Sequence, residues 1–182
     1  MNQHDAFEEL LRRNNELARA HQPLPDLKVA LKPVRAGFII ISCSDPRLNP
    51  YKIFGLDASF GGRVTMIRNA GGRAIDAVRT ISALQTIGAA KTILVVHHND
   101  CGMSHYSDAD IRTAMLKIAP EEETAIGKSR YGEIDEGSIE KSLNHDVAFL
   151  RDCPFIIPGT QIMGLAYDIK TGFLTKVAEA ER

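Results

Sequence analysis

Tryptophan is absent from the 182-residue sequence, and cysteine occurs only three times. Three thiols cannot all pair within one chain, and a secreted disulfide framework would normally use more of them. The longest apolar runs, at residues 37–41 and 93–96, are too short to cross a bilayer. Residues 1–10 are polar and acidic and lack the pattern of a secretory signal. We therefore expect a cytoplasmic protein with no membrane partner, whose thiols serve as ligands, nucleophiles or core filler.

An excess of charge of either sign is also missing, because 22 lysine and arginine residues stand against 23 aspartate and glutamate residues. The formal net charge of −1 gives no electrostatic reason to expect nucleic acid as a partner. Repeats, low-complexity tracts and long linkers are absent as well. A chain of this length suffices for one domain with a sizeable core, so we predict a single domain over residues 1–182.

Apolar residues at helical spacing predict helices at residues 5–20, 74–87 and 138–151, and from residue 107 onward. The first helix is amphipathic and should end before Pro23 and Pro25, because proline cannot continue a helix. Gly88 is well placed to end the second helix, and residues 107–110 resemble a capping box that begins the next one. Residues 120–137 are acidic and aperiodic, which predicts a surface loop.

Short apolar runs rich in β-branched residues alternate with these helices. They predict strands at Gly37–Ser42, Val64–Ile67, Thr92–His97, Phe155–Ile157 and Met163–Ile169. Continuous apolar strands separated by helices indicate an α/β fold with a mainly parallel β-sheet flanked by helices. In such sheets ligands gather at the carboxyl ends of the strands, so residues that follow strands are the first candidates for a site.

Two of the predicted strands end in residues that can bind a metal ion. Cys43 follows the strand at 37–42, and His98 and Cys101 follow the strand at 92–97. The spacing of His98 and Cys101 lets both side chains converge on one ion across a tight turn. Two thiolates and one imidazole suit zinc, and three protein ligands leave a coordination position open, as catalytic zinc sites do.

Asp45 and Arg47 come shortly after Cys43 in the sequence. A carboxylate beside the metal would orient a zinc-bound hydroxide towards the substrate, and Arg47 would hold Asp45 ionised and directed. The alternative is a surface ion pair that contributes little to stability.

A glycine-containing turn, residues 68–72, lies between a predicted strand and the helix at 74–87. It lacks both common phosphate-binding glycine patterns, so we interpret it as a close approach of the backbone to a small pocket. The residues expected to wall this pocket are Asn69, Ala70, Gly71 and Gly102.

The cysteines and histidines allow other interpretations. Cys43 and Cys101 could form a redox-sensitive disulfide, and Cys153 is interpreted as core filler. Alternation along the strand points His97 away from the expected ligand beside it, so His97 is predicted to be a packed or hydrogen-bonded neighbour. His105 lies just beyond the turn, where it either relays protons or is simply solvated.

Three motifs in order, C-x-D-x-R at 43–47, R-N-A-G at 68–71 and H-x-x-C-G at 98–102, make the sequence similar to the β-class carbonic anhydrase family. Related carbonyl sulfide and carbon disulfide hydrolases share this scaffold. The resemblance covers about residues 36–170 and implies a zinc-binding core of β-carbonic-anhydrase-like fold there. It also implies that residues 1–25 form a projecting N-terminal helical arm.

The resemblance further implies one zinc ion per chain on Cys43, His98 and Cys101, with Asp45 and Arg47 as the catalytic pair. In some members of the family the aspartate itself ligates zinc in a closed, inactive form, so Asp45 is a possible fourth ligand. A homodimer or homotetramer is implied as well.

These residues predict a zinc-hydroxide enzyme that acts on a small heterocumulene, with reversible hydration of carbon dioxide to bicarbonate as the first choice. The alternative on the same scaffold is a carbonyl sulfide or carbon disulfide hydrolase that releases hydrogen sulfide and carbon dioxide. A non-catalytic zinc or thiol redox sensor is more distant, because it leaves Asp45 and Arg47 without a purpose. A phosphatase or sulfurtransferase with Cys43 as nucleophile is disfavoured, since the loop from Cys43 to Arg47 is short for wrapping an oxyanion.

Overall fold

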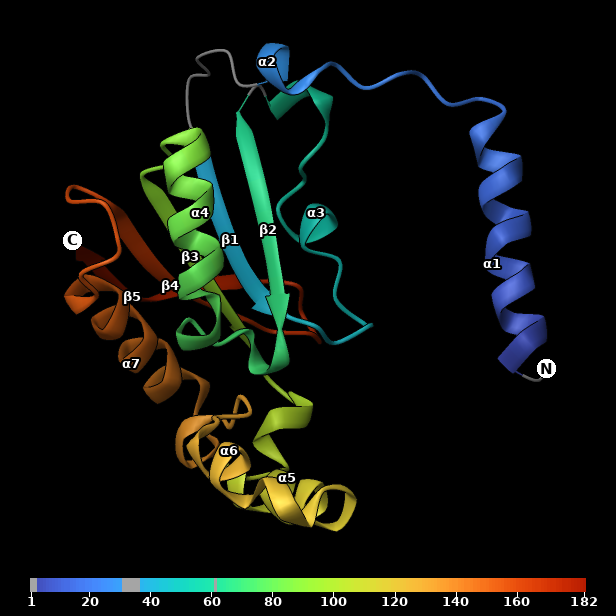
Figure 1. The fold of residues 1–182 in the computed structure, drawn as a ribbon. Helices are drawn as coiled ribbons and strands as arrows, with labels where there is room; N and C mark the ends of the chain where they lie inside the picture. The colour runs from blue at the N-terminus through green and yellow to red at the C-terminus, as the bar shows by residue number, and fades with distance from the viewer. Residues whose placement is uncertain (1–2, 31–36, 61) are drawn as a thin grey trace. The chain divides into compact units, whose positions relative to one another are not determined.

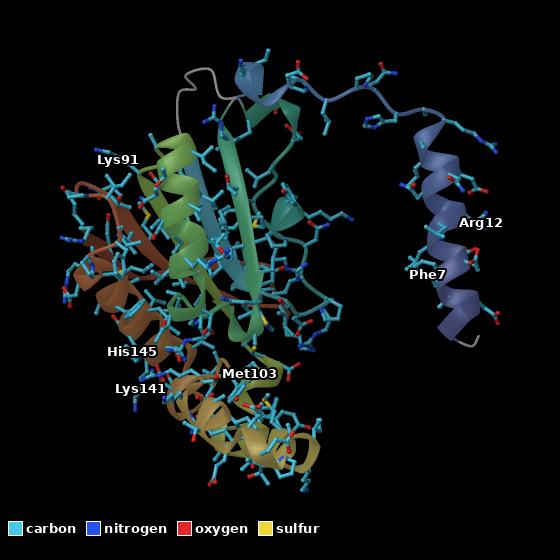
Figure 2. The ribbon with its side chains drawn as sticks, viewed as in Figure 1. Phe7, Arg12, Lys91, Met103, Lys141 and His145 are labelled. Atoms are coloured by element: carbon cyan, nitrogen blue, oxygen red, sulfur yellow. The ribbon has the colours of Figure 1, made fainter. Side chains whose placement is uncertain are left out.

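The computed structural model describes residues 3–30, 37–60 and 62–182 of the chain. They fall into two units, Met1–Pro33 and Val34–Arg182. The first unit contains α1 (Gln3–Ala18) and α2 (Leu27–Ala30) (Figure 1). The predicted N-terminal helix is therefore confirmed, and it carries exposed apolar side chains such as Phe7, labelled in Figure 2.

The second unit is built on one five-stranded sheet with the strand order β2-β1-β3-β4-β5. The strands are β1 (Gly37–Cys43), β2 (Arg63–Asn69), β3 (Thr92–His98), β4 (Gln161–Tyr167) and β5 (Leu174–Glu181). The first four are parallel to one another, and β5 pairs with β4 in the antiparallel direction. The mainly parallel α/β sheet that the sequence predicts is thus confirmed.

The sheet buries an apolar layer on each face. On one face, Ile39 and Val95 from the central strands pack with Ile81 of α4 (Val78–Gly88) and Leu143 of α7 (Ile139–Asp152). On the other face, Ile40, Leu94 and Val96 pack with side chains of the segment that follows the short helix α3 (Pro50–Ile53). Because both faces are covered, the central strands are apolar at consecutive positions, and their carboxyl ends meet at one edge of the sheet (Figure 1).

The helix boundaries follow from capping residues that the sequence shows. Ser107 caps α5 (Asp108–Ile118) in a capping box with Asp110, and Ser138 caps α7. Helix α4 ends at Gly88 as predicted, although the left-handed residue that closes it is Ala89. Within the described residues, no helix has the length and apolar character that crossing a membrane requires.

The strand predicted at Phe155–Ile157 is wrong, because this segment forms turns after α7. Pro154 and Pro158 flank it, and proline has no backbone N–H to donate to a strand ladder. Ile156 is fully buried in the core, which explains the apolar run without a strand.

The antiparallel strand β5 carries no prediction from the sequence. It contains one lysine, two alanines and two glutamates and faces solvent at many positions, so it shows neither a buried run nor a clean alternation. The predicted surface loop at 120–137 is also partly wrong, since it contains the short helix α6 (Glu123–Lys128). Six residues are too few to display a helical stripe in a sequence.

Candidate metal centre

The carboxyl ends of β1 and β3 bring the predicted ligands together. The two strands pair in parallel up to Ser42 and Val96, so Cys43 and His98 leave the sheet at the same edge. Cys101 follows β3 after a turn in which Asp100 adopts a positive φ of 54°. One potential ligand atom from each of Cys43, His98 and Cys101 lies within 4.8 Å of the others, and all three residues are buried.

The chemistry of these donor atoms fits a zinc ion. His98 Nδ1 lies 2.9 Å from the carbonyl oxygen of Asn99, which can only accept, so Nδ1 carries the proton. His98 Nε2 is therefore a lone-pair donor, and it is buried without a hydrogen-bond partner. The Sγ atoms of Cys43 and Cys101 lie 3.7 Å apart, and neither is in a disulfide. Two sulfurs and one unpartnered imidazole nitrogen form a donor set that zinc prefers.

The two thiols affect each other's ionisation. The neighbouring Cys101 sulfur, together with His98, lowers the pKa of Cys43 although burial opposes this. The same closeness to Cys43 and burial raise the pKa of Cys101. One thiolate is thus favoured in the metal-free protein, and a bound cation would favour the second by offsetting the repulsion between two negative sulfurs.

Asp45 lies beside the three ligands and is held by Arg47. Arg47 Nη2 donates to Asp45 Oδ2 at 2.7 Å, and Arg47 Nε lies 3.0 Å from Oδ1. Arg47 also pairs with Asp100, through Nη1 to Oδ2 at 2.7 Å. The guanidinium of Arg47 lowers the pKa of Asp45 to about 2, so this carboxylate is ionised at neutral pH. Its Oδ2 lies 3.9 Å from Nε2 of His98.

Arg68 has a role at this site that sequence reasoning missed. Its Nε donates to the carbonyl oxygen of Cys43 at 3.1 Å, and its Nη2 donates to that of Asp45 at 2.6 Å. Arg68 thereby fixes the backbone between Cys43 and Asp45. Its position at the start of the R-N-A-G motif was the available signal.

The turn after β2 packs closely against the two strands that carry ligands. Gly72 has a φ of +71°, and a Cβ there would lie 2.9 Å from both the nitrogen of Cys43 and the carbonyl oxygen of Val96. Gly71 also has a positive φ, and a Cβ there would collide with the carbonyl oxygen of Gly132. The turn therefore lies close to the backbone of β1 and β3, and its expected approach to a small pocket stays a prediction.

Gly72→Ala should lower the free energy of unfolding by at least about 2 kcal/mol, because it adds backbone strain and a collision with backbone atoms. Gly55→Ala is the matched control, since Gly55 has a φ of +59° but open space around its Cα. Its expected cost is about 1 kcal/mol from strain alone. Urea denaturation of both variants checks this, and equal losses would show that the packing of Gly72 is unimportant.

The four predicted pocket residues differ in their exposure to solvent. Asn69 is half-buried, and its Oδ1 is buried without a hydrogen-bond partner, while its Nδ2 donates to the carbonyl of Arg73. Gly71 is buried, whereas Ala70 and Gly102 are exposed. Apolar side chains that the sequence did not single out pack around the two cysteines: Leu48 and Ile134, with Met103, Tyr167 and Ile169.

The remaining cysteine and histidines lie outside the ligand group. Cys153 is buried in the main core, consistent with a filler role. His105 is 63% exposed as a side chain and lies 3.5 Å from Asp100 through its Nε2. His97 is fully buried and points to Asp146 of α7, with 3.3 Å between Nε2 and Oδ2.

The chain is similar to known proteins in both sequence and fold. A family profile described as "Carbonic anhydrase" matches residues 38–174. Beta-carbonic anhydrase 1 of Mycobacterium tuberculosis is 29% identical over 139 residues, which cover 76% of this chain and 80% of that protein. Carbon disulfide hydrolase of Acidianus sp. is 24% identical over 156 residues, 75% of each chain. The solved carbonic anhydrase from Glaciozyma antarctica superposes with a TM-score of 0.69 at 33% identity, covering 87% of this chain and 98% of that one.

Proposed function

Since the chain belongs to the β-carbonic anhydrase family, we propose that it is a zinc-dependent enzyme that catalyses the reversible hydration of carbon dioxide to bicarbonate. One zinc ion per chain would be held by Cys43, His98 and Cys101. The observation that carries this proposal is the unpartnered, buried Nε2 of His98 facing two buried sulfurs at the carboxyl edge of the sheet.

A zinc ion bound there supplies a Lewis acid that makes water nucleophilic at neutral pH. Asp45 is ionised and lies next to His98, so it accepts a hydrogen bond from the reacting water and orients one of its lone pairs. Arg47 holds Asp45 through paired hydrogen bonds and cannot lose its own charge near neutral pH. The pair therefore positions the nucleophile in a fixed direction, which supports an enzyme over a passive zinc or thiol sensor.

The surroundings of the ligands suit a small uncharged substrate. The apolar side chains of Leu48 and Ile134 belong to the same buried cluster as the two cysteines. A hollow of about 330 Å³ is lined by Arg47, Lys52 and Tyr167. We propose that Asn69, Ala70, Gly71 and Gly102 wall a small substrate pocket beside the metal site.

Hydrolysis of carbon disulfide or carbonyl sulfide is the second candidate function. It is favoured by the similarity to a carbon disulfide hydrolase over three quarters of the chain. The same donor set and the same Asp45–Arg47 pair would serve it, because each of these substrates is also a linear molecule attacked at its carbon. Pocket size and access, rather than the ligands, would separate the two activities.

Stopped-flow hydration of carbon dioxide, run beside an assay of sulfide release from carbonyl sulfide and carbon disulfide, ranks the two functions. We expect hydration to have the larger kcat/KM by at least about tenfold, a difference of about 1.4 kcal/mol in transition-state stabilisation. Rapid sulfide release with negligible hydration would reverse the order of the two proposals.

The location and assembly of the protein are further parts of the proposal. Unpaired thiols at all three cysteines suit the reducing cytoplasm. Apolar side chains on α1 are exposed, namely Phe7, Leu10, Leu11 and Leu17. Because such a stripe is costly to leave in water, a homodimer or homotetramer that covers it is the expected assembly.

A further inference from the structure

A buried cluster of charged and polar side chains, formed by Arg73, His97 and Asp146, adjoins the elements that carry the metal ligands. Their exposed fractions are 5%, 0% and 2%. None of the three is a candidate ligand, and the mechanism above uses none of them. Charged groups this deeply buried need a structural or functional reason, because removing them from water is costly.

Asp146 is the centre of this cluster. It lies on the buried face of α7, and its carboxylate accepts from Arg73 through Nε at 3.1 Å and Nη2 at 3.0 Å. Asp146 Oδ2 also accepts from the backbone N–H of Ala74 at 2.9 Å. The third neighbour is His97, whose Nε2 lies 3.3 Å from the same oxygen. The carboxylate of this α7 residue thus contacts both the turn after β2 and the end of β3.

Two of these contacts involve residues that adjoin the metal ligands in the sequence or in the packing of the backbone. His97 immediately precedes His98 in β3, so the buried contact of its ring with Asp146, which is close although not an aligned hydrogen bond, restricts the strand end that presents His98. Arg73 and Ala74 follow the turn in which Gly72 packs against the backbone of Cys43. An anchor on this turn therefore supports the end of β1 from which Cys43 projects.

A third connection runs through Arg73 to the segment before α7. Arg73 Nη1 donates to the carbonyl oxygen of Glu133, and Nη2 lies 3.2 Å from Asp135 Oδ2. Ile134, between these two residues, belongs to the apolar cluster that contains both ligand cysteines. Its backbone N–H donates to the carbonyl of Met103 at 3.1 Å. The Arg73–Asp146 pair thus also fixes the apolar wall beside the sulfurs.

Stability alone does not account for such a pair, because apolar side chains of similar volume usually replace a buried ion pair at no cost or with a gain. We propose that Asp146, acting with Arg73, is a positioning residue that keeps Cys43 and His98 at the spacing that zinc binding requires. The proposal rests on the zinc site put forward under Proposed function. Partners that orient ligands in other metal sites typically contribute 10- to 100-fold in affinity.

The test is a double variant, Arg73→Met with Asp146→Leu, which removes both charges and should remain folded. Zinc affinity is measured by competition with a chromophoric chelator, and ligand geometry by the visible spectrum of the cobalt-substituted protein. We expect zinc affinity to fall by about 10- to 100-fold and the cobalt bands to shift. The single variant Asp146→Asn, which keeps the shape and one acceptor oxygen, is expected to show the same changes to a smaller degree.

The matched control is Gln85→Leu with Thr160→Val. These two residues form a buried hydrogen-bonded pair, 3.0 Å between Nε2 and Oγ1, outside the ligand group and its supporting turn. The control should lose stability in urea yet keep the zinc affinity and cobalt spectrum of the parent protein. Unchanged affinity and spectrum in both Asp146 variants, or an equal loss in the control, would overturn the proposal. Failure of the parent protein to bind zinc would instead refute the zinc site itself.

Discussion

Replacing Cys101 by alanine is expected to weaken zinc binding by more than about 100-fold, so that the purified variant retains little metal. The loss of a supporting partner alone typically costs 10- to 100-fold, and Cys101 is one of only three ligands in the proposed site. Cys43→Ala and His98→Ala should behave alike, because each removes one donor from the same group. Metal analysis of the purified proteins measures the effect.

Cys153 provides the matched control for this experiment. It is a buried cysteine like Cys101, but it packs in the main core and not in the ligand group. Cys153→Ala should lower the free energy of unfolding modestly and leave one zinc ion per chain. If Cys153→Ala lost zinc, or if Cys101→Ala kept it at full occupancy, the ligand assignment would be wrong.

Asp45→Asn should keep the metal and lose most of the catalytic activity. The asparagine side chain retains the size of the aspartate but cannot accept through two charged oxygens, so the reacting water loses its orienting partner. Loss of a well-positioned acid–base or orienting group typically lowers kcat by about 100-fold or more. The expected result is therefore a low kcat for carbon dioxide hydration at unchanged zinc content.

Asp100→Asn separates the role of Asp45 from a general disturbance of Arg47. Asp100 is the other carboxylate partner of Arg47, it is 55% exposed as a side chain, and exposed ion pairs contribute about 0–1 kcal/mol. A loss of no more than about fivefold is expected for this variant. Full turnover in Asp45→Asn, or an equal loss in both variants, would contradict the orienting role of Asp45.

The grouping of Cys43, His98 and Cys101 could be predicted from the sequence because its signals are local. Cys43, His98 and Cys101 each stand at or just after the end of an unbroken apolar run, and such runs are buried parallel strands whose ends share one edge. Asp45 and Arg47 lie within four residues of Cys43, so their placement needs no long-range information. The structure places these five residues together.

The supporting residues could not be predicted in this way. Asp146 lies 48 positions after His98 on a predicted helix, where its spacing from Leu143 and Leu150 places it on the apolar face but does not reveal a partner. Only the packing of α7 against the sheet brings Arg73 to it. Arg73 itself follows the glycine turn, where an arginine is equally compatible with solvent.

Two differences between the predicted and the observed strands have separate physical causes. Phe155–Ile157 looks like a strand because tertiary packing buries Ile156 within a turn, so an apolar run arose without regular structure. Strand β5 is an edge strand, paired on one side only, and its charged residues at Lys176 and Glu179 face solvent. Edge strands commonly carry such charges, which hide the pattern of a buried strand.

The central claim is that hydration of carbon dioxide depends on a zinc ion held by Cys43, His98 and Cys101. The most direct measurement strips the purified protein with a chelator and then follows hydration by stopped flow as zinc is added back. The account predicts that the rate rises linearly and stops rising at one zinc ion per chain, and that Cys101→Ala shows no such rise. Hydration at the full rate in the zinc-free protein, or no hydration after one equivalent of zinc is added, would contradict the dependence on zinc.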